Sequence, residues 1–410
     1  MSETPPQAYI SKVHLKGYKI IKDLEIDFKP GLNIIIGPNG SGKTNFVDFI
    51  SLLNRRGYEN QLYREMFEAE LDCKGIKVFS LLSLTMQLQI KTVDKRIRIK
   101  SSTEKQEKKF IFKILEDIES SDPQFNSTAK YVFDGSKMNL SIENSNHAHY
   151  DIVDTKKISF SNPLNFMDSK SSIELLHEDS DDYEYNQGRS YDLTVKSAFE
   201  DIEDKQYTKL DGFTRLIMFL WQGYDTSFDA SFIENLFNYL PSSSPISEVR
   251  LDKKIVSSKR NGDEERLSNI INALEFKVND NWWTWDNLSD GTKRLFYIIC
   301  EVCSFDGLIF LEEPELGIHP DQLSDLMDFL KEQAKEKQII ITTHSPEVMN
   351  ILNKDELDRI IVTRFDKEKG TQMHKLSPHK IKKGQIYMKK VGHLSDFWVH
   401  SNLEEIDEED

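Results

Sequence analysis

The sequence predicts an α/β fold in which a mixed, mostly parallel core sheet carries a phosphate-binding loop. Three observations predict it. The apolar run "LNIII" leads into "GPNGSGKT" and then into the helical pattern "TNFVDFISLLNRR", which gives strand, glycine-rich loop and helix in that order. Strands and helices alternate again after about residue 280. Between them, from about 75 to 165, apolar residues recur with the period of two that is typical of an antiparallel sheet.

The elements follow along the chain. The opening "YISKVHLKGYKIIKDLEIDFKPGLNIIIG" predicts three short strands. In "SLLSLTMQLQIK" the residues that alternate with polar ones are Leu82, Leu84, Met86, Leu88 and Ile90. Asp134-Gly135 is a hairpin signal. A polar, acidic connection is expected from about 165 to 200, and helices in "FTRLIMFLWQGY", "DASFIENLFNYL" and "ERLSNIINALEF". The last part predicts a helix after "NLSDG", the strand "GLIFLEEPE", a helix over "DQLSDLMDFLKEQAKE" and the strand "QIIITTHS".

Composition excludes several classes of protein. The 410 residues are 38% hydrophobic and 30% charged, without an apolar run near the roughly 20 residues that span a bilayer. The start "MSETPPQAYISK" lacks the features of a signal peptide, so we expect a cytoplasmic protein without membrane contact. Three cysteines do not make a disulfide framework. Cys300 and Cys303 form a CxxC inside an apolar helical run, which favours two buried helix residues over a redox or zinc site.

Charge is unevenly distributed along the chain. With a net charge of -16, the protein as a whole should repel polyanions. The segment "KTVDKRIRIKSSTEKQEKK" is nevertheless basic, whereas "HEDSDDYEY" and "LEEIDEED" are acidic. Such runs are usually solvated faces, but the basic one is the best place in the sequence to look for contact with nucleic acid.

The glycine-rich loop fits the pattern G-x-x-x-x-G-K-[ST] at every fixed position. Its backbone N–H groups would turn toward the phosphates of ATP, Lys43 would bridge the β- and γ-phosphates, and the Thr44 hydroxyl would ligate Mg²⁺. We call Gly37–Thr44 the phosphate loop. The residues that would bind the nucleotide there are Gly37, Pro38, Asn39, Gly40, Ser41, Gly42, Lys43 and Thr44.

Three further motifs supply chemistry at a distance. The apolar strand in "LIFLEEPE" ends in Glu312 and Glu313; the first carboxylate suits the Mg²⁺ shell and the second suits a general base that orients water. "LSDGTKR" opens a helix and forms a second anion site. "IIITTHSPE" is a strand that ends at His344.

Taken together, "GPNGSGKT", "LSDGTK", "LIFLEEPELGIHP" and "ITTHS" resemble the ABC-type ATPase fold in its RecF/SMC/OLD branch. The resemblance implies an ATPase head with a mixed or parallel core sheet, an antiparallel β subdomain and a helical signature lobe. It also implies a homodimer, or a higher oligomer, that sandwiches ATP and Mg²⁺. Ser289 and Gly291 would contact the γ-phosphate held by the partner chain. Glu312 would serve the metal, Glu313 would activate water and His344 would sense the γ-phosphate. "ELGIHP" would communicate across the dimer.

The resemblance covers about residues 8–55 and 280–350. It implies a split ATPase domain over 1–365, with core segments 1–57 and 281–365, an inserted antiparallel region at about 65–165 and a helical lobe at about 195–290. An extension with an acidic tail would occupy 366–410. Two residues depart from the commonest pattern: Asp290 replaces a signature glycine and Glu312 stands where aspartate is usual. The metal-contacting glutamine of the family has no clear counterpart, although Gln87 and Gln89 are candidates.

For several other residues the sequence allows two interpretations. Trp282, Trp283 and Trp285 suit packing of the helical lobe better than stacking on a base or a partner. His319 suits the inter-subunit loop better than a metal site. Tyr18 and Lys19 suit either contact with the nucleotide or plain core and surface positions.

Two features of the sequence exclude some kinds of ATPase. The chain has no long heptad arms, and only about sixty residues follow "TTHSPEVMN", too few for a nuclease domain. The leading hypothesis is the sensor or scaffold of a prokaryotic antiphage system, similar to the ATPase subunits of PARIS- or Septu-type defences, with a separately encoded effector such as a nuclease. The alternative is a RecF-like DNA-binding ATPase of repair or recombination. A plain metabolic NTPase is the third reading, and the signature motif counts against it.

Overall fold

The computed structural model describes most of the chain in twelve stretches: 8–54, 66–82, 87–106, 109–123, 126–133, 138–143, 164–167, 216, 220, 227–252, 274–304 and 308–401. The chain divides into two compact units. The first consists of Met1–Phe166, Gly307–Glu312 and Ala334–Asp410, and the second of Met167–Asp306 and Glu313–Gln333.

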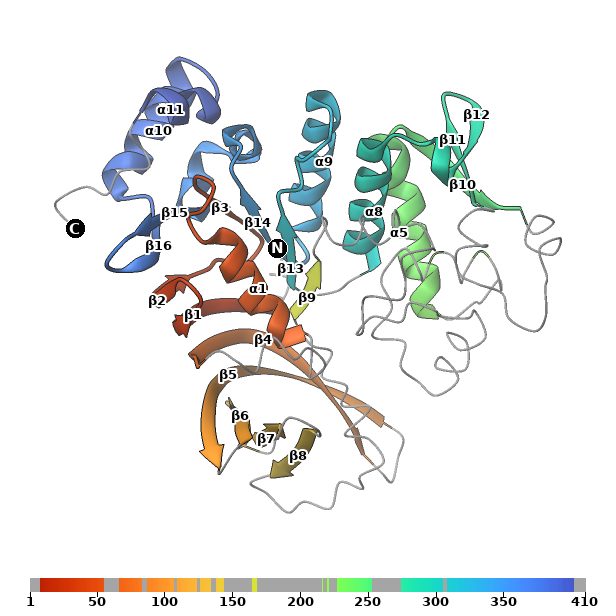
Figure 1. Ribbon diagram of the computed structural model, residues 1–410. Helices are drawn as coiled ribbons and strands as arrows, with labels where there is room; N and C mark the ends of the chain where they lie inside the picture. Colours follow the sequence, from red (N-terminus) through yellow and green to blue (C-terminus); the bar gives the residue numbers. More distant parts are fainter. Residues whose placement is uncertain are drawn as a thin grey trace. The chain divides into compact units, whose positions relative to one another are not determined.

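A 13-stranded mixed sheet organises the first unit (Figure 1). Its spatial order is β8-β7-β6-β5-β4-β1-β2-β16-β15-β3-β14-β13-β9. The strands are β1 (Tyr9–Tyr18), β2 (Ile21–Asp27), β3 (Leu32–Ile36), β4 (Glu68–Leu82), β5 (Gln87–Gln106), β6 (Lys109–Ser120), β7 (Ser127–Phe133), β8 (Met138–Glu143), β9 (Leu164–Met167), β13 (Leu308–Glu312), β14 (Gln338–Thr343), β15 (Ile360–Asp366) and β16 (Gly370–Lys375). This confirms the predicted α/β class with a mixed core sheet.

The centre of the sheet is parallel. β3 lies between β14 and β15 and runs parallel to both, and β14 is in turn parallel to β13. All positions of β3 and β14 are buried, which fits the three consecutive isoleucines that each strand carries. Because parallel strands end at the same edge, the residues that follow β3, β13 and β14 gather there.

The predicted antiparallel region is confirmed as a meander. Strands β4 to β8 pair in succession, each antiparallel to the one before. β4 also pairs with β1, so this region continues the core sheet rather than forming a second sheet. Met86 and the expected Asp134-Gly135 turn lie outside the described residues.

Helix α1 (Lys43–Asn54) begins inside the phosphate loop and packs on the sheet through aromatic rings. Phe46 lies against Phe28 and Phe310, with ring centroids 6.1 and 6.4 Å apart. Phe49 meets Tyr18 edge to face at 5.7 Å. All these rings are buried, so the loop is tied to a rigid core through the helix that follows it.

The sheet does not end at residue 365, where the sequence led us to place the start of an extension. β16 pairs with β15 and, at its first residue, with Ile21 of β2. Short 3₁₀ helices η6 (Pro346–Ile351) and η7 (Lys354–Arg359) precede β15, and helices α10 (Pro378–Lys390) and α11 (Leu394–His400) follow β16. Gly384 lets α10 approach Leu357 of η7 closely.

The second unit combines helices with a small antiparallel sheet. Its helices are α5 (Ser227–Ser243), α8 (Asp290–Ser304) and α9 (Pro320–Gln333), and its three-stranded sheet has the order β10-β11-β12. The strands are β10 (Ile246–Leu251), β11 (Leu274–Val278) and β12 (Asn281–Thr284), joined to α8 by the 3₁₀ turn η5 (Trp285–Asn287). The expected helices "DASFIENLFNYL" and "DQLSDLMDFLKEQAKE" are confirmed.

The helix expected over "ERLSNIINALEF" is wrong at its end. Leu274 and Phe276 belong to β11, and the residues before them are not described. Both side chains are fully buried, so their apolar spacing reflects one face of a strand. The lobe predicted as helical therefore contains a sheet as well. Of the expected helix "FTRLIMFLWQGY" only 216 and 220 are described, and both are helical.

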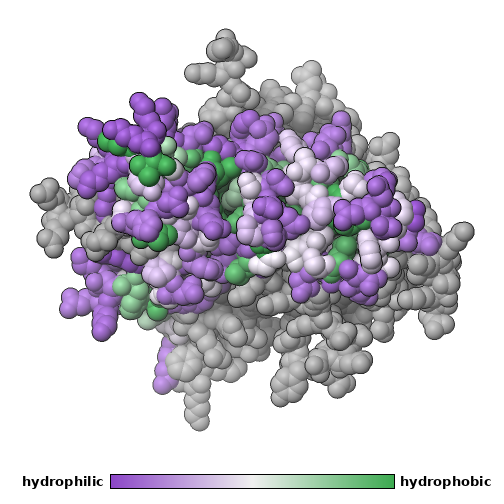
Figure 2. Space-filling model, turned by 90° about the horizontal axis from the view of Figure 1, so that it is seen from above, coloured by the Kyte–Doolittle hydropathy of each residue, from purple (hydrophilic) through white to green (hydrophobic). Residues whose placement is uncertain are grey.

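Described surface residues seen in Figure 2 are mostly hydrophilic, with apolar ones scattered among them. Large exposed apolar side chains include Trp283, Phe365, Ile386, Val391 and Val399. Among the helices that the structure describes, none is long and apolar enough to cross a membrane.

Candidate functional site

The phosphate loop joins the end of β3 to the start of α1. The Gly37 N–H faces the carbonyl of Thr343 at the end of β14, at 3.4 Å. Pro38, Asn39 and Gly40 are exposed, whereas Ser41, Gly42 and Lys43 are buried. The loop therefore exposes Pro38–Gly40 and Thr44 to solvent and buries Gly37 and Ser41–Lys43 in the fold.

Lys43 is only 6% exposed, yet it carries a charge. Its ammonium donates to the carbonyl oxygens of Gly37 and Pro38, at 2.7 and 3.1 Å. A buried cation needs such partners, because its desolvation is costly. The lysine is thus held over the loop's own backbone, where phosphate oxygens would compete for it.

The Thr44 hydroxyl donates a 2.6 Å hydrogen bond to Oε1 of Glu312. Glu312 is the last residue of β13, and it pairs in the sheet with Thr342 of β14. His344 is exposed and directly follows β14. The sheet edge thereby brings Thr44 and Glu312 into contact, with Lys43 beside Thr44 in the chain and His344 directly after β14 at the same edge.

A hydroxyl and a carboxylate at this spacing are a suitable pair of oxygen donors for Mg²⁺, which usually takes one or two protein ligands and completes its shell with phosphate and water. Within the described residues no cluster of three His, Cys, Asp or Glu side chains could hold a metal by itself. The residues present at the loop fit a magnesium ion that arrives with a nucleotide.

Glu313 belongs to the second unit and has an unusual backbone. Its φ of 45° lies in the left-handed region that non-glycine residues rarely adopt. Nη2 of Arg294 donates a 2.8 Å hydrogen bond to the Glu313 carbonyl oxygen. Strained backbone that is held by its surroundings is frequent at functional sites. The sequence does not reveal this contact, although Arg294 closes the "LSDGTKR" motif.

The signature segment, Leu288–Arg294, starts helix α8. The Ser289 hydroxyl accepts from the Thr292 N–H at 3.2 Å, which caps the helix start. Asp290 is exposed and lies 3.9 Å from the Lys293 ammonium. A Cβ on Gly291 would come within 2.3 Å of the Gly317 carbonyl oxygen, so only glycine lets α8 approach the "ELGIHP" loop this closely. Ser289 remains exposed at the helix start.

The structure places the three tryptophans for which the sequence left two interpretations open. Trp285 is buried against Phe276 and Phe296, so it packs the core of the second unit. Trp282 stacks on the Arg250 guanidinium at 3.9 Å, while Trp283 is 43% exposed.

Tyr18 lies in the core and Lys19 on the surface, which is one of the two interpretations that the sequence left open. Tyr18 is buried, and Lys19 pairs with Asp48 at 2.5 Å. His319 is exposed and lies 3.7 Å from Asp321. Gln87 and Gln89 lie in β5, paired with Leu82 and Ser80 of β4.

The cysteines are buried free thiols, as predicted for Cys300 and Cys303. Burial raises the pKa of the Cys73 thiol to about 12. A thiol with so high a pKa is a poor nucleophile, so Cys73 has a packing role.

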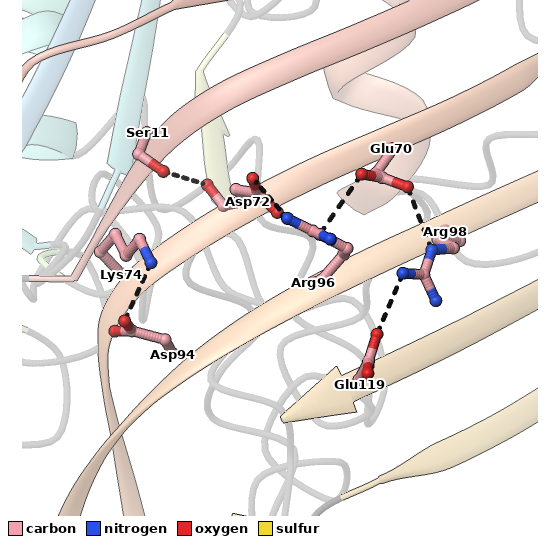
Figure 3. Close-up of polar contacts among 8 residues, drawn as sticks. All are labelled: Ser11, Glu70, Asp72, Lys74, Asp94, Arg96, Arg98 and Glu119. Atoms are coloured by element: carbon pink, nitrogen blue, oxygen red, sulfur yellow. Dashed lines mark hydrogen bonds and ion pairs between the residues drawn. The ribbon is translucent and has the colours of Figure 1, made fainter. Parts of the chain in front are cut away.

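Three cationic side chains of the basic segment pair with acidic neighbours, and Figure 3 shows two of them, Arg96 and Arg98. Arg96 donates through Nε and Nη2 to Asp72, at 2.6 and 3.1 Å. Arg98 contacts Glu70 and Glu119 at 3.0 Å. Lys100 lies 2.5 Å from Glu68. These pairs cross β4, β5 and β6, so Arg96, Arg98 and Lys100 belong to a paired, solvated face of the sheet.

The chain is similar to several known proteins. Residues 32–350 match the family described as "AAA domain, putative AbiEii toxin, Type IV TA system". The chain belongs to this family. It also matches the DNA replication and repair protein RecF of Desulfitobacterium hafniense, with 40% identity over 72 residues, 18% of this chain and 19% of that protein. RecF of Streptococcus equi subsp. zooepidemicus is 33% identical over 102 residues, 24% and 28% of the two chains. The chain thus matches only 19% and 28% of the length of these two curated relatives.

The chain also matches solved structures of low sequence identity. The SmcHead bound to the C-winged helix domain of ScpA is 16% identical, covers 91% of this chain and 99% of that chain, and has a TM-score of 0.49. The SMC head domain from Thermotoga maritima is 13% identical, covers 90% and 99%, and has a TM-score of 0.40. The family match thus places the chain among AAA-domain proteins, and a short stretch of it is similar to RecF.

Proposed function

We propose that the protein binds ATP with Mg²⁺ at the edge of its parallel strands and hydrolyses it, acting as a nucleotide-dependent dimeric switch. The observation that carries the proposal is the 2.6 Å hydrogen bond between Thr44 and Glu312. It joins a phosphate-loop hydroxyl to a carboxylate at the end of β13, which is separated from β3 by β14. A hydroxyl and a carboxylate are the donors that a nucleotide-bound Mg²⁺ takes in P-loop enzymes.

Each residue of the loop then has a task. The backbone N–H groups of Gly37–Thr44 and the start of α1 receive the phosphates. Lys43 would exchange its contacts with the Gly37 and Pro38 carbonyls for phosphate oxygens. Thr44 and Glu312 would hold the Mg²⁺, which when bound neutralises charge that develops on the transferred phosphoryl group. His344, at the end of β14, would contact the γ-phosphate.

Glu313 would orient and deprotonate the attacking water. The support for this role is its place directly after Glu312 and its strained backbone, held by Arg294. A carboxylate that accepts a proton at the moment of attack needs a fixed position more than a particular strength as a base.

The dimer would form through the signature segment of each chain. Ser289 and Gly291 at the start of α8 would contact the γ-phosphate held by the partner's loop, so that two ATP molecules lie between two chains. The exposed, capped helix start suits this role because its N–H groups favour an anion. The Glu315–Pro320 loop, packed on Gly291, would carry the nucleotide state across the interface.

For the wider role we propose a sensor or scaffold subunit of a prokaryotic antiphage system in the cytoplasm, with a separately encoded effector such as a nuclease. The family description supports it, since it names a putative toxin of a TA system, a setting with more than one component.

A RecF-like DNA-binding role is the second candidate, supported by the 40% identical stretch shared with RecF. The paired state of Arg96, Arg98 and Lys100 speaks against the basic segment as its DNA contact.

The deciding experiment is an affinity purification of Glu313→Gln with ATP and Mg²⁺ from the native host, with Lys43→Ala as the matched control that lacks nucleotide. A nuclease enriched on Glu313→Gln alone supports the defence role. DNA together with replication or repair proteins supports the RecF-like role. A protein that purifies alone under both conditions contradicts the proposal of an effector partner.

A further inference from the structure

The phosphate loop touches a part of the chain that lies beyond the matched family residues 32–350. This part is the hairpin of β15 and β16, in which Phe365 pairs with Thr371. β15 runs beside β3 and pairs Val362 with Ile36, the last residue before the loop. The hairpin is thus placed by the core sheet directly alongside the loop.

Two close approaches join the hairpin to the loop. A Cβ on Gly37 would lie 2.1 Å from the Thr363 carbonyl oxygen. A Cβ on Gly42 would lie 1.9 Å from Oγ1, 2.8 Å from Cγ2 and 2.9 Å from Cβ of Thr371. The whole branched end of Thr371 therefore faces the backbone of Gly42, immediately before Lys43.

Gly42 also has a φ of 101°, a conformation that side-chain-bearing residues rarely adopt. Thr371 is fully buried, and its backbone N–H donates to the Ile20 carbonyl at 3.1 Å, which fixes it to the turn between β1 and β2. Among the residues that the structure describes, the Thr371 hydroxyl has no hydrogen-bond partner. Its contribution is therefore one of shape: a rigid β-branched side chain wedged against the loop.

We propose that Thr371 is a positioning residue for ATP binding, which holds Gly42 in its left-handed conformation and so sets the direction of the loop N–H groups and of Lys43. The proposal rests on the proposed ATP site. It assigns a role in nucleotide affinity to the C-terminal hairpin, whose sequence "KEKGTQMHK" carries no recognisable motif.

The test compares ATP affinity with stability in the full-length chain. Thr371→Val keeps the shape and is expected to bind ATP within about threefold of wild type, because a buried hydroxyl without a partner adds little. Thr371→Ile adds a carbon against Gly42 and is expected to raise the Kd for ATP about tenfold or more. In steady-state kinetics KM should rise more than kcat falls, because the loop holds the phosphates before and during the reaction.

Met373→Ala is the matched control. Met373 lies two residues further along β16, on the same face, and belongs to the buried core. It should lower the melting temperature without changing the Kd for ATP. If Thr371→Ile does not fold, Thr371→Ala serves instead, since it removes both γ atoms beside Gly42 and should also raise the Kd.

Several outcomes would overturn the inference. Wild-type affinity in both Thr371→Ile and Thr371→Ala would show that the wedge does not set the loop. If Met373→Ala raised the Kd for ATP as much as the Thr371 variants do, at a similar loss of stability, the rise in Kd would be explained by general destabilisation. A large loss of affinity in Thr371→Val would refute the argument from shape. Absence of ATP binding by wild type would instead contradict the proposed function itself.

Discussion

Thr44 and Glu312 are 268 residues apart in the sequence and share a 2.6 Å hydrogen bond. The bond exists because β3 and β13 both flank β14 in the parallel part of the sheet, so that the start of α1 and the end of β13 meet at one edge. The proposed Mg²⁺ ligands, Thr44 and Glu312, follow from this meeting of two distant segments of the chain.

Replacing Glu312 with glutamine should keep the packing of the edge, because the amide oxygen can still accept from Thr44. The charge that attracts Mg²⁺ is lost. We expect ATP hydrolysis to fall about a hundredfold or more, since the charge stabilisation that a metal supplies is worth several kcal/mol and each ~1.4 kcal/mol is a factor of ten. Titration with Mg²⁺ measures the effect, and Glu312→Asp, which retains the charge, is the control. Equal Mg²⁺ dependence in Glu312→Gln and wild type would refute the metal assignment.

Glu313→Gln should bind ATP as wild type does and hydrolyse it about 10²–10⁴-fold more slowly, the usual contribution of a general base. Binding is measured with a fluorescent ATP analogue and hydrolysis by phosphate release. Undiminished turnover would remove Glu313 from the mechanism. Lys43→Ala, which should lose binding itself, distinguishes the two steps.

Gly291→Ala tests the contact between α8 and the Glu315–Pro320 loop. The added Cβ would meet the Gly317 carbonyl at 2.3 Å, so α8 or the loop has to move, at a cost on the order of 1–3 kcal/mol. We expect a lower melting temperature and reduced hydrolysis. Gly317→Asn is a suitable comparison, because a Cβ there meets no atom within 4 Å and asparagine tolerates its φ of 72°. A fully active, fully stable Gly291→Ala would contradict the close approach.

The Arg96 guanidinium, hydrogen-bonded to Asp72, lowers the pKa of that carboxyl below its ordinary value of 3.8. The folded chain therefore binds this proton less readily than the unfolded chain. The pair stabilises the fold above pH 3.8, and the contribution is lost as pH falls through the lowered folded value. Acid unfolding of wild type should accordingly be steeper below pH 3.8 than that of Asp72→Asn. Identical pH profiles of the two proteins would contradict the assignment.

The sequence predicted the parts of the fold that have a strong local pattern. "LNIIIGPNGSGKT" specifies a buried strand and a phosphate loop through its own residues, and the strand before Glu312 is recognised by its apolar run. β11 was taken for a helix, because in a short apolar segment such as "ALEF" the spacing of a strand and of a helix are hard to separate.

The pairing of strands that lie far apart in the chain could not be predicted from the sequence. Nothing in "KRIRIK" shows that acidic residues of β4 and β6 lie opposite, because antiparallel register brings together residues far apart in the chain. The position of Thr371 against Gly42 likewise depends on the sheet order β2-β16-β15-β3. In this order β15 and β16, the last two strands in the sequence, lie between β2 and β3, which are near its start.

The central claim is that ATP closes two chains on each other through the phosphate loop of one and the signature segment of the other. The most direct test is the mass in solution of Glu313→Gln, measured by light scattering with ATP and Mg²⁺, with ADP, and without nucleotide. The chain is 47.7 kDa. We expect twice that mass or a larger multiple with ATP only, and the mass of a single chain when Ser289→Arg is added. A protein that binds ATP and retains the mass of one chain in every state would contradict it.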